Sequence, residues 1–154
     1  MSATGLTVLA MAACAGWLAP LSPTLRAAEP AAPAKPHPST AEVKSEITAV
    51  IDAQLAAFRA NDYARAYSFA ATEIKGMFNA TEFEEMVRKA YPVIAKSTSV
   101  DYGFSFDTGE QAVIYVRVQD AAKTAAQYQY LLKKEDGAWR ITGVTVATDD
   151  ARSV

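Results

Sequence analysis

The sequence predicts an α+β fold in which amino-terminal helices pack on a curved antiparallel sheet of about four strands. Three observations carry this prediction. Apolar residues recur at helical spacing over residues 43–58. Segments of alternating or continuous apolar residues follow from residue 97 onward, as is typical of strands. The last of these segments changes its phase at Gly143, which indicates a β-bulge or bend and therefore a curved sheet.

The first helix is expected over about residues 40–60. Ser39 and Glu42 have the spacing of a capping box, so we expect Ser39 to begin this helix. Asp52 and Gln54 are expected to lie off its apolar stripe, with Asp52 on the solvated face. The stripe itself consists of Val43, Ile47, Val50, Ile51, Leu55 and Phe58, which lie three or four residues apart.

Further helices are expected before the strands. Asn61 can end the first helix, and Asp62 can cap the second. Residues 72–79 are expected to form a short helical turn. Thr81 and Glu84 form another capping-box pattern, which opens a helix that ends before Pro92. The buried side of the second helix is expected to include Tyr63, Ala66, Tyr67 and Ala70.

Four strands are expected, over residues 97–106, 111–120, 125–134 and 139–146. The second is apolar on both faces, which indicates a central strand or an outer face that meets another subunit. An Asp-Gly pair between the third and fourth strands is typical of a hairpin turn. In the first strand, the residues expected to face one way are Val100, Tyr102, Phe104 and Phe106.

Composition excludes several classes of function. The chain has 154 residues and a net charge of −2, so nothing indicates a nucleic-acid-binding protein. Its one cysteine is Cys14, and its one histidine is His37. The chain after His37 therefore lacks the residues needed for a cysteine nucleophile, a disulfide, a Cys/His zinc site or a Ser-His-Asp triad. We predict no catalytic residue, no metal site and no cofactor.

Residues 1–28 resemble a secretory signal peptide. Residues 3–21 are almost wholly apolar or small, and the small residues near Ala27 and Ala28 favour cleavage after one of them. No Lys or Arg precedes the apolar run, which departs from the usual pattern. A mature chain without cysteine suits the periplasm or the cell exterior. After cleavage, no stable membrane insertion is expected.

Two alternatives for this segment remain open. Its length is close to the ~20 residues that span a bilayer, so it could stay attached as an uncleaved membrane anchor. Cys14 could instead be acylated, although the apolar run continues past it. Residues 29–38 contain four prolines and are expected to form an extended linker with a solvated His37. The domain is expected over residues 39–147, followed by a tail over residues 148–154.

Two short motifs point to a family. Residues 51–67 read Ile-Asp-Ala-Gln-Leu-x-Ala-Phe-Arg-Ala-Asn-Asp-Tyr-x-x-Ala-Tyr, and residues 137–141 read Gly-Ala-Trp-Arg-Ile. With the aromatic and valine-rich hairpins, they resemble the nuclear transport factor 2-like superfamily, also described as cystatin-like or SnoaL-like. Within it, residues 39–147 resemble a bacterial family of unknown function whose members often carry signal peptides. The resemblance implies a curved sheet that wraps helices into a cone with an apolar cavity.

The resemblance assigns no site residue, and the candidates for a ligand site come from the sequence itself. The enzymes of this superfamily use an Asp or His base with Tyr or His partners, but no such residue could be matched here, so no catalytic role is assigned. Arg117 could hold an anionic ligand, or it could pair with an acid on the sheet surface. Aromatic residues could line the pocket or simply fill the core, and the candidates are Tyr63, Tyr67, Tyr102, Phe104, Tyr128, Tyr130 and Trp139.

Three functions follow as hypotheses, because this fold hosts many activities. The preferred one is a non-catalytic exported domain that binds a small apolar ligand or forms a homodimer through its outer sheet face. The second is an isomerase, dehydratase or cyclase whose base is a buried carboxylate with a raised pKa. The third is an envelope protein that docks a partner on the sheet face carrying Val113 and Tyr115.

Overall fold

The computed structural model describes residues 34–147, and these form an α+β domain. The predicted signal peptide, Cys14 with its alternative acylation and the predicted carboxy-terminal tail lie outside the described residues. The helices are α1 (Ala41–Arg59), α2 (Tyr63–Ser68), α3 (Thr72–Met77), α4 (Ala80–Ala90) and α5 (Pro92–Ala95). The strands are β1 (His37–Pro38), β2 (Ser97–Asp107), β3 (Gln111–Asp120), β4 (Ala125–Glu135) and β5 (Ala138–Val146).

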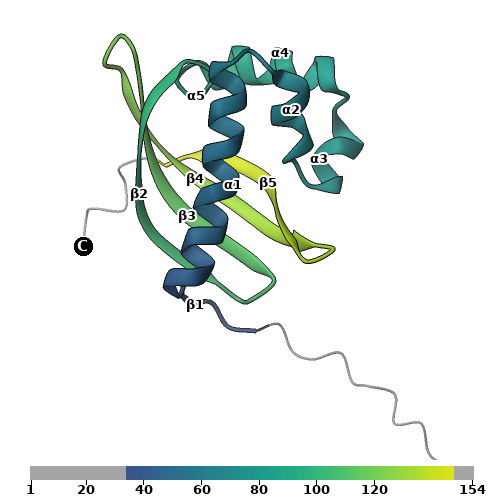
Figure 1. Ribbon diagram of the computed structural model, residues 1–154, viewed down its shortest axis with the longest axis vertical. Helices are drawn as coiled ribbons and strands as arrows, with labels where there is room; N and C mark the ends of the chain where they lie inside the picture. Colours follow the sequence, from purple (N-terminus) through teal and green to yellow (C-terminus); the bar gives the residue numbers. More distant parts are fainter. Residues whose placement is uncertain (1–33, 148–154) are drawn as a thin grey trace, which may run out of the picture. The chain divides into compact units, whose positions relative to one another are not determined.

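The five strands form one antiparallel sheet in the order β1-β2-β3-β4-β5. Figure 1 shows that α1 crosses one face of this sheet and that α2, α3 and α4 gather beside one end of it. The predicted fold class is therefore confirmed. Within residues 34–147, no helix has the length and apolar character needed to cross a membrane.

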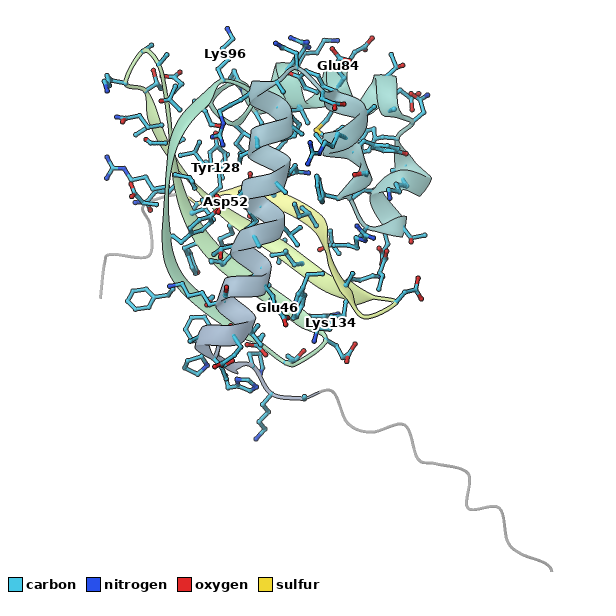
Figure 2. All side chains as sticks on the ribbon, in the orientation of Figure 1. Glu46, Asp52, Glu84, Lys96, Tyr128 and Lys134 are labelled. Atoms are coloured by element: carbon cyan, nitrogen blue, oxygen red, sulfur yellow. The ribbon has the colours of Figure 1, made fainter. Side chains whose placement is uncertain are left out.

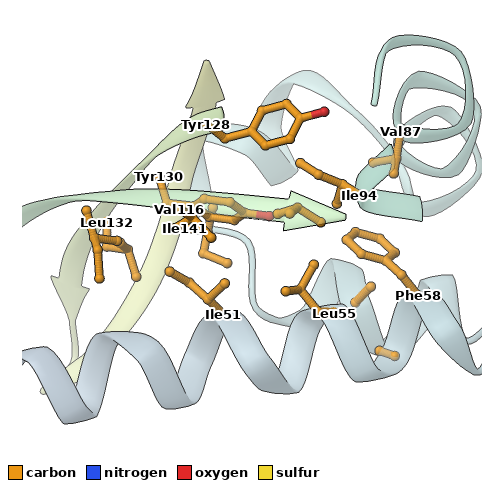
Figure 3. Packing of buried hydrophobic residues seen from close by; sticks show 14 of the residues in the cluster. Ile51, Leu55, Phe58, Val87, Ile94, Val116, Tyr128, Tyr130, Leu132 and Ile141 are labelled. Carbon is orange, nitrogen blue, oxygen red and sulfur yellow. The ribbon is translucent and has the colours of Figure 1, made fainter. Parts of the chain in front are cut away.

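The core lies between α1 and the inner face of the sheet. Ile47, Ile51 and Leu55 on α1 are fully buried, and they belong to one apolar cluster with inward residues of β3 and β4. Figure 3 shows Ile51 and Leu55 pointing from the helix toward Val116 and Tyr130. The predicted stripe thus forms the helical half of the core, because its spacing places every member on one side of the helix.

Two helix caps differ from the prediction by one or two residues. Thr40, rather than Ser39, caps α1, and its Oγ1 accepts a hydrogen bond from the Val43 amide at 3.3 Å. In α4 the capping box joins Asn79 and Glu82 rather than Thr81 and Glu84. Both stretches contain several residues able to cap, so the motif alone does not select one.

The turn between α1 and α2 agrees with the prediction. Asn61 adopts a left-handed conformation with φ of 55°, which ends the first helix. Asp62 then caps α2, since its Oδ1 accepts a hydrogen bond from the Arg65 amide at 3.0 Å. Two helices can therefore fold back on each other across very few residues.

Strand β2 contradicts the predicted alternation. A register shift between Tyr102 and Ser105 inserts a bulge and reverses the phase of the strand. Tyr102 faces α1 as expected, but Phe104 is 80% exposed and Phe106 also points outward. Ser105 and Asp107 take the inward positions instead. A single extra residue in the ladder is enough to exchange the two faces.

Strand β5 bends where it was predicted to. Leu131 pairs with Gly143 and Leu132 pairs with Ile141, so Thr142 has no partner and forms a bulge. The outer edge of β5 is also occupied, because the Ala71 amide donates to the Ile141 carbonyl and the Ile141 amide donates to the Phe69 carbonyl. The segment between α2 and α3 is thereby attached to the sheet.

The end of the predicted linker belongs to the sheet. His37 pairs with Asp107, and Pro38 pairs with Phe106, so these two residues form an additional edge strand. His37 Nε2 lies 3.8 Å from Asp107 Oδ1. His37 is exposed, as predicted for a solvated residue, but it belongs to an edge strand of the sheet rather than to a free linker.

Candidate functional site

A cavity of about 320 Å³ opens between the helices α3 and α4 and the strand β5. Its volume is at the lower end of the range for small-molecule sites. The floor is formed by buried side chains from α1, α4, α5 and the sheet, and it includes Phe58, Phe83, Val87, Ile94, Tyr130 and Ile141. The rim is formed by partly exposed residues, which include Ile74, Phe78, Met86, Ala90, Tyr91 and Val144.

The sequence of α4 explains one wall. Phe83, Met86, Val87 and Ala90 follow helical spacing, so the helix turns a continuous apolar side toward the cavity. The bulge at Thr142 explains the opposite wall. It changes the direction of β5 at Gly143 and Val144, and both residues line the cavity. The cavity therefore depends on the bend that the strand pattern predicts.

Few polar groups reach this cavity. Gln54 is 4% exposed, and its Nε2 donates a hydrogen bond to the Ala66 carbonyl at 3.3 Å. The Tyr91 hydroxyl donates to the Val144 carbonyl at 2.7 Å, which joins the α4–α5 junction to β5. The Tyr130 hydroxyl has no hydrogen-bond partner within residues 34–147. No acidic or basic side chain of these residues contributes to the lining.

Tyr130 remains a neutral phenol at physiological pH. Burial is the main cause of a strong upward shift in its pKa, and nearby Tyr128 and Tyr91 raise the pKa further. The hydroxyl can therefore donate a hydrogen bond over the whole physiological range. Among the aromatic candidates from the sequence, Tyr130 is the one that lines the cavity.

Tyr63 and Tyr67 support the cavity from behind its lining. Tyr63 packs at a tilt against Phe58, with ring centroids 5.6 Å apart. Tyr67 packs at a tilt against Phe83 at 5.4 Å, and its hydroxyl donates to the Phe78 carbonyl at 2.6 Å. Neither tyrosine lines the cavity, but both contact side chains that do.

Three other aromatic candidates lie elsewhere in the domain. The Tyr102 hydroxyl donates to Asp52 Oδ1 at 2.6 Å, and burial, with this bond, raises the pKa of Tyr102. Tyr128 is buried and packs against Tyr91. Trp139 Nε1 donates to Glu46 Oε2 at 2.8 Å. Figure 2 shows Glu46 at the end of the molecule away from Glu84 of α4. Trp139 is not among the residues that line the cavity.

Phe104 and Arg117 lie on the outer sheet face. The bulge in β2 turns Phe104 outward, so it is not part of the cavity. Arg117 lies opposite Asp101 on β2 and Gln127 on β4. It borders a surface depression of about 340 Å³, together with residues 125–127 and the end of β5. The candidate anion site and the apolar cavity are therefore on different faces of the sheet.

Gln54 was placed wrongly by the sequence interpretation. It lies three residues after Ile51 and four before Phe58, so helical spacing puts it on the buried side of α1. Its position in the stripe was the signal that could have identified it. The contributions of Ile94 and Val144 had no comparable signal, because they depend on how distant elements meet.

One buried carboxylate is present in the described domain, but it lies outside the cavity. Asp107 is 2% exposed, and its Oδ1 accepts a hydrogen bond from the Gly109 amide at 2.9 Å. It therefore caps the turn between β2 and β3. Asp107 does not line the cavity, so it is not placed to act on a molecule bound there.

A comparison with known protein families shows which family the chain belongs to. Residues 40–154 match the family described as Domain of unknown function (DUF4864). The chain belongs to this family. No curated protein matches the chain.

A comparison with solved structures finds proteins similar to this DUF4864 domain. One is the solution structure of RPA3114, a SEC-C motif containing protein from Rhodopseudomonas palustris, with a TM-score of 0.51 and 12% identity over 65% of this chain and 77% of that chain. Another is Aln2 from a Streptomyces species, with a TM-score of 0.43 and 13% identity over 73% of this chain and 95% of that chain. At this identity, the likeness to RPA3114 concerns the fold alone.

Proposed function

We propose that this DUF4864 domain binds a small apolar molecule in the cavity between α4 and β5. The observation that carries the proposal is a cavity of about 320 Å³ whose lining is almost wholly apolar. Apolar cavities of this size favour apolar ligands, since such a ligand leaves water without giving up hydrogen bonds. The rim is open to solvent at Ala90 and Met86, which gives a ligand a route of entry.

Closing the rim should weaken binding. Ala90 is exposed and borders the cavity, so Ala90→Trp places an indole across the opening without removing a core contact. With 2-ethylnaphthalene as the test compound, we expect affinity measured by equilibrium dialysis to fall at least about tenfold. Ala64→Trp is the matched control, because Ala64 is exposed on α2 and does not line the cavity. Equal binding by both variants would contradict the proposal.

The enzyme alternative has less support. It requires a carboxylate base beside the bound molecule, and no Asp or Glu of residues 34–147 lines the cavity. The buried Asp107 instead caps a turn. Binding without chemistry is therefore the function that we propose for this site.

We also propose that the family is part of the nuclear transport factor 2-like superfamily. The support is the order of helices followed by an antiparallel sheet, together with the cover of helices on one sheet face (Figure 1). The motifs over residues 51–67 and 137–141 support the same relation. An experimental structure of a family member would test this relation. If that structure superposed on members of the superfamily only through isolated hairpins, the proposed membership would be wrong.

We propose that the protein is exported and that the domain works in the periplasm or outside the cell. The support is the apolar segment of residues 3–21, followed by small residues. Amino-terminal sequencing of the protein from a periplasmic extract should give a start at Ala28 or Glu29. Recovery of the full-length chain from the cytoplasm alone would contradict export, and full-length chain in the membrane fraction would support the uncleaved anchor.

A second candidate function rests on the outer sheet face. Phe104, Phe106, Val113, Tyr115 and Leu131 form an outer apolar patch across β2, β3 and β4. No helix of residues 34–147 covers this face (Figure 1). Exposed apolar patches commonly mark interaction sites.

We propose a second copy of the chain as the occupant of this outer apolar patch. Asp101 and Arg117 lie opposite each other at its border, so the border carries both signs of charge. Such a border does not favour a strongly acidic or basic partner, whereas a two-fold axis can bring the acid of each copy to the base of the other.

A further inference from the structure

Tyr130 lines the cavity, and its buried hydroxyl has no hydrogen-bond partner in the described domain. Its side chain is 0% exposed, and its hydroxyl makes no hydrogen bond within residues 34–147. An unpaired buried hydroxyl is unfavourable, and phenylalanine would fill the same ring volume without that cost. The hydroxyl therefore needs a partner that the domain itself does not supply.

The position of this hydroxyl points to a ligand. Tyr130 is one of the lining residues of the cavity. Figure 3 shows its hydroxyl directed along the core toward the end where Ile94 and Phe58 lie, and both of these also line the cavity. Their apolar side chains offer no hydrogen-bond acceptor. A bound molecule can supply one.

The remaining polar lining narrows the chemistry of that molecule. Gln54 Nε2 carries two N–H groups and donates to the Ala66 carbonyl, so it retains a second donor. The polar groups of the lining are thus the Tyr130 hydroxyl, the Tyr91 hydroxyl and the Gln54 side-chain amide, which offers both donors and a carbonyl acceptor. Among them, the Tyr130 hydroxyl is the buried group without a hydrogen-bond partner in the described domain. None of the described residues that line the cavity has a charged side chain, so an ionised ligand would find no opposite charge there. An unpaired charge in an apolar site is strongly unfavourable.

We propose that the ligand is an uncharged, largely apolar molecule that presents a carbonyl oxygen to the Tyr130 hydroxyl. This inference rests on the proposed ligand-binding function and adds the chemical class of the ligand. The Tyr130 hydroxyl is the specificity-determining group. Because burial keeps the phenol protonated, it donates the hydrogen bond at any physiological pH.

Three naphthalene derivatives of similar shape test this inference. 2-Acetylnaphthalene carries a carbonyl, 2-ethylnaphthalene lacks an acceptor, and 2-naphthoate is charged. In equilibrium dialysis against the full chain, we expect the acetyl compound to bind about tenfold more tightly than the ethyl compound. The naphthoate should bind most weakly. Tyr130→Phe should remove the preference for the acetyl compound and leave affinity for the ethyl compound unchanged.

Tyr128→Phe is the matched control. Tyr128 is buried on the same strand and the same face, but it does not line the cavity, so this variant should keep the preference. Tyr130→Phe should also fold at least as stably as the unchanged chain in thermal melts, since it removes an unpaired group. If it does not fold, contacts between the acetyl methyl group and Ile94 in nuclear Overhauser spectra of the unchanged chain decide the question.

The outcomes separate the two proposals. If the ethyl compound fails to bind the unchanged chain, the proposed ligand-binding function is wrong. If it binds but the acetyl compound is not preferred, or if the preference survives in Tyr130→Phe, only the carbonyl assignment is overturned. Absence of the Ile94 contact would likewise contradict this placement of the ligand.

Discussion

Ile51→Ala should lower the free energy of unfolding by about 3 kcal/mol. Ile51 is fully buried at the centre of the α1 stripe and belongs to the cluster that joins the helix to β3 and β4. The substitution removes apolar contacts and leaves a cavity that the rigid sheet cannot close. Urea denaturation monitored by circular dichroism measures the change.

Ser45→Ala on the same helix is the control for this prediction. Ser45 is exposed, so its replacement should change the free energy of unfolding by less than about 0.5 kcal/mol. A loss below about 1 kcal/mol for Ile51→Ala would show that α1 is not the central element of the core. The comparison separates packing from helix propensity, because alanine is the new residue in both variants.

Tyr115→Asp should convert the proposed dimer to a monomer. Tyr115 lies within the outer apolar patch, where a carboxylate would be buried by the second copy without a partner. A cost of about 3 kcal/mol would raise the dissociation constant of the dimer about 100-fold. Sedimentation velocity over a range of concentrations measures this change.

Gln119→Asp provides the matched control for the dimer. Gln119 lies on the same strand and the same face, beyond Arg117 and outside the outer apolar patch. It should leave the dissociation constant within about twofold of the original value. Phe104→Asp gives an independent test, because this side chain is 80% exposed and its replacement removes no core contact. A monomer for the unchanged chain at high concentration would reject the proposed homodimer.

Much of the fold could be predicted from periodicity and turn chemistry. The stripe of α1 identified its buried face, because every third or fourth residue is a large apolar one. Asn61 and Asp62 located the turn, since one tolerates a left-handed conformation and the other caps the next helix. The change of phase at Gly143 located the bend in β5. Each of these signals acts within a few residues.

The bulge in β2 could not be predicted in the same way. Residues 97–106 alternate without interruption, so the sequence contains no change of phase there. The bulge depends on the pairing of β2 with β3, and Gly103 allows that close approach. A Cβ atom on Gly103 would lie only 3.3 Å from the Tyr115 carbonyl oxygen. Register between strands is a property of the pair, so one strand alone does not reveal it.

The cavity was harder to predict than the fold. Its walls come from α1, α4 and β5, which are distant in the sequence, and their side chains meet only in the folded domain. Aromatic content favoured seven candidate residues, but most aromatic side chains fill the core or face solvent, and Tyr130 lines the cavity. Local patterns report which side chains are buried. They do not report where packing is incomplete.

The two irregular strands have a further consequence for solubility. β2 and β5 form the long edges of the sheet, and each contains a bulge. On the outer edge of β2, His37 and Pro38 pair with the residues next to the β2–β3 turn. On the outer edge of β5, the segment between α2 and α3 forms backbone hydrogen bonds with Ile141. An incoming strand would meet an interrupted row of amides and carbonyls on either side. The interrupted edges thus disfavour edge-to-edge strand pairing between molecules, which leads to fibres in proteins with long, regular edge strands.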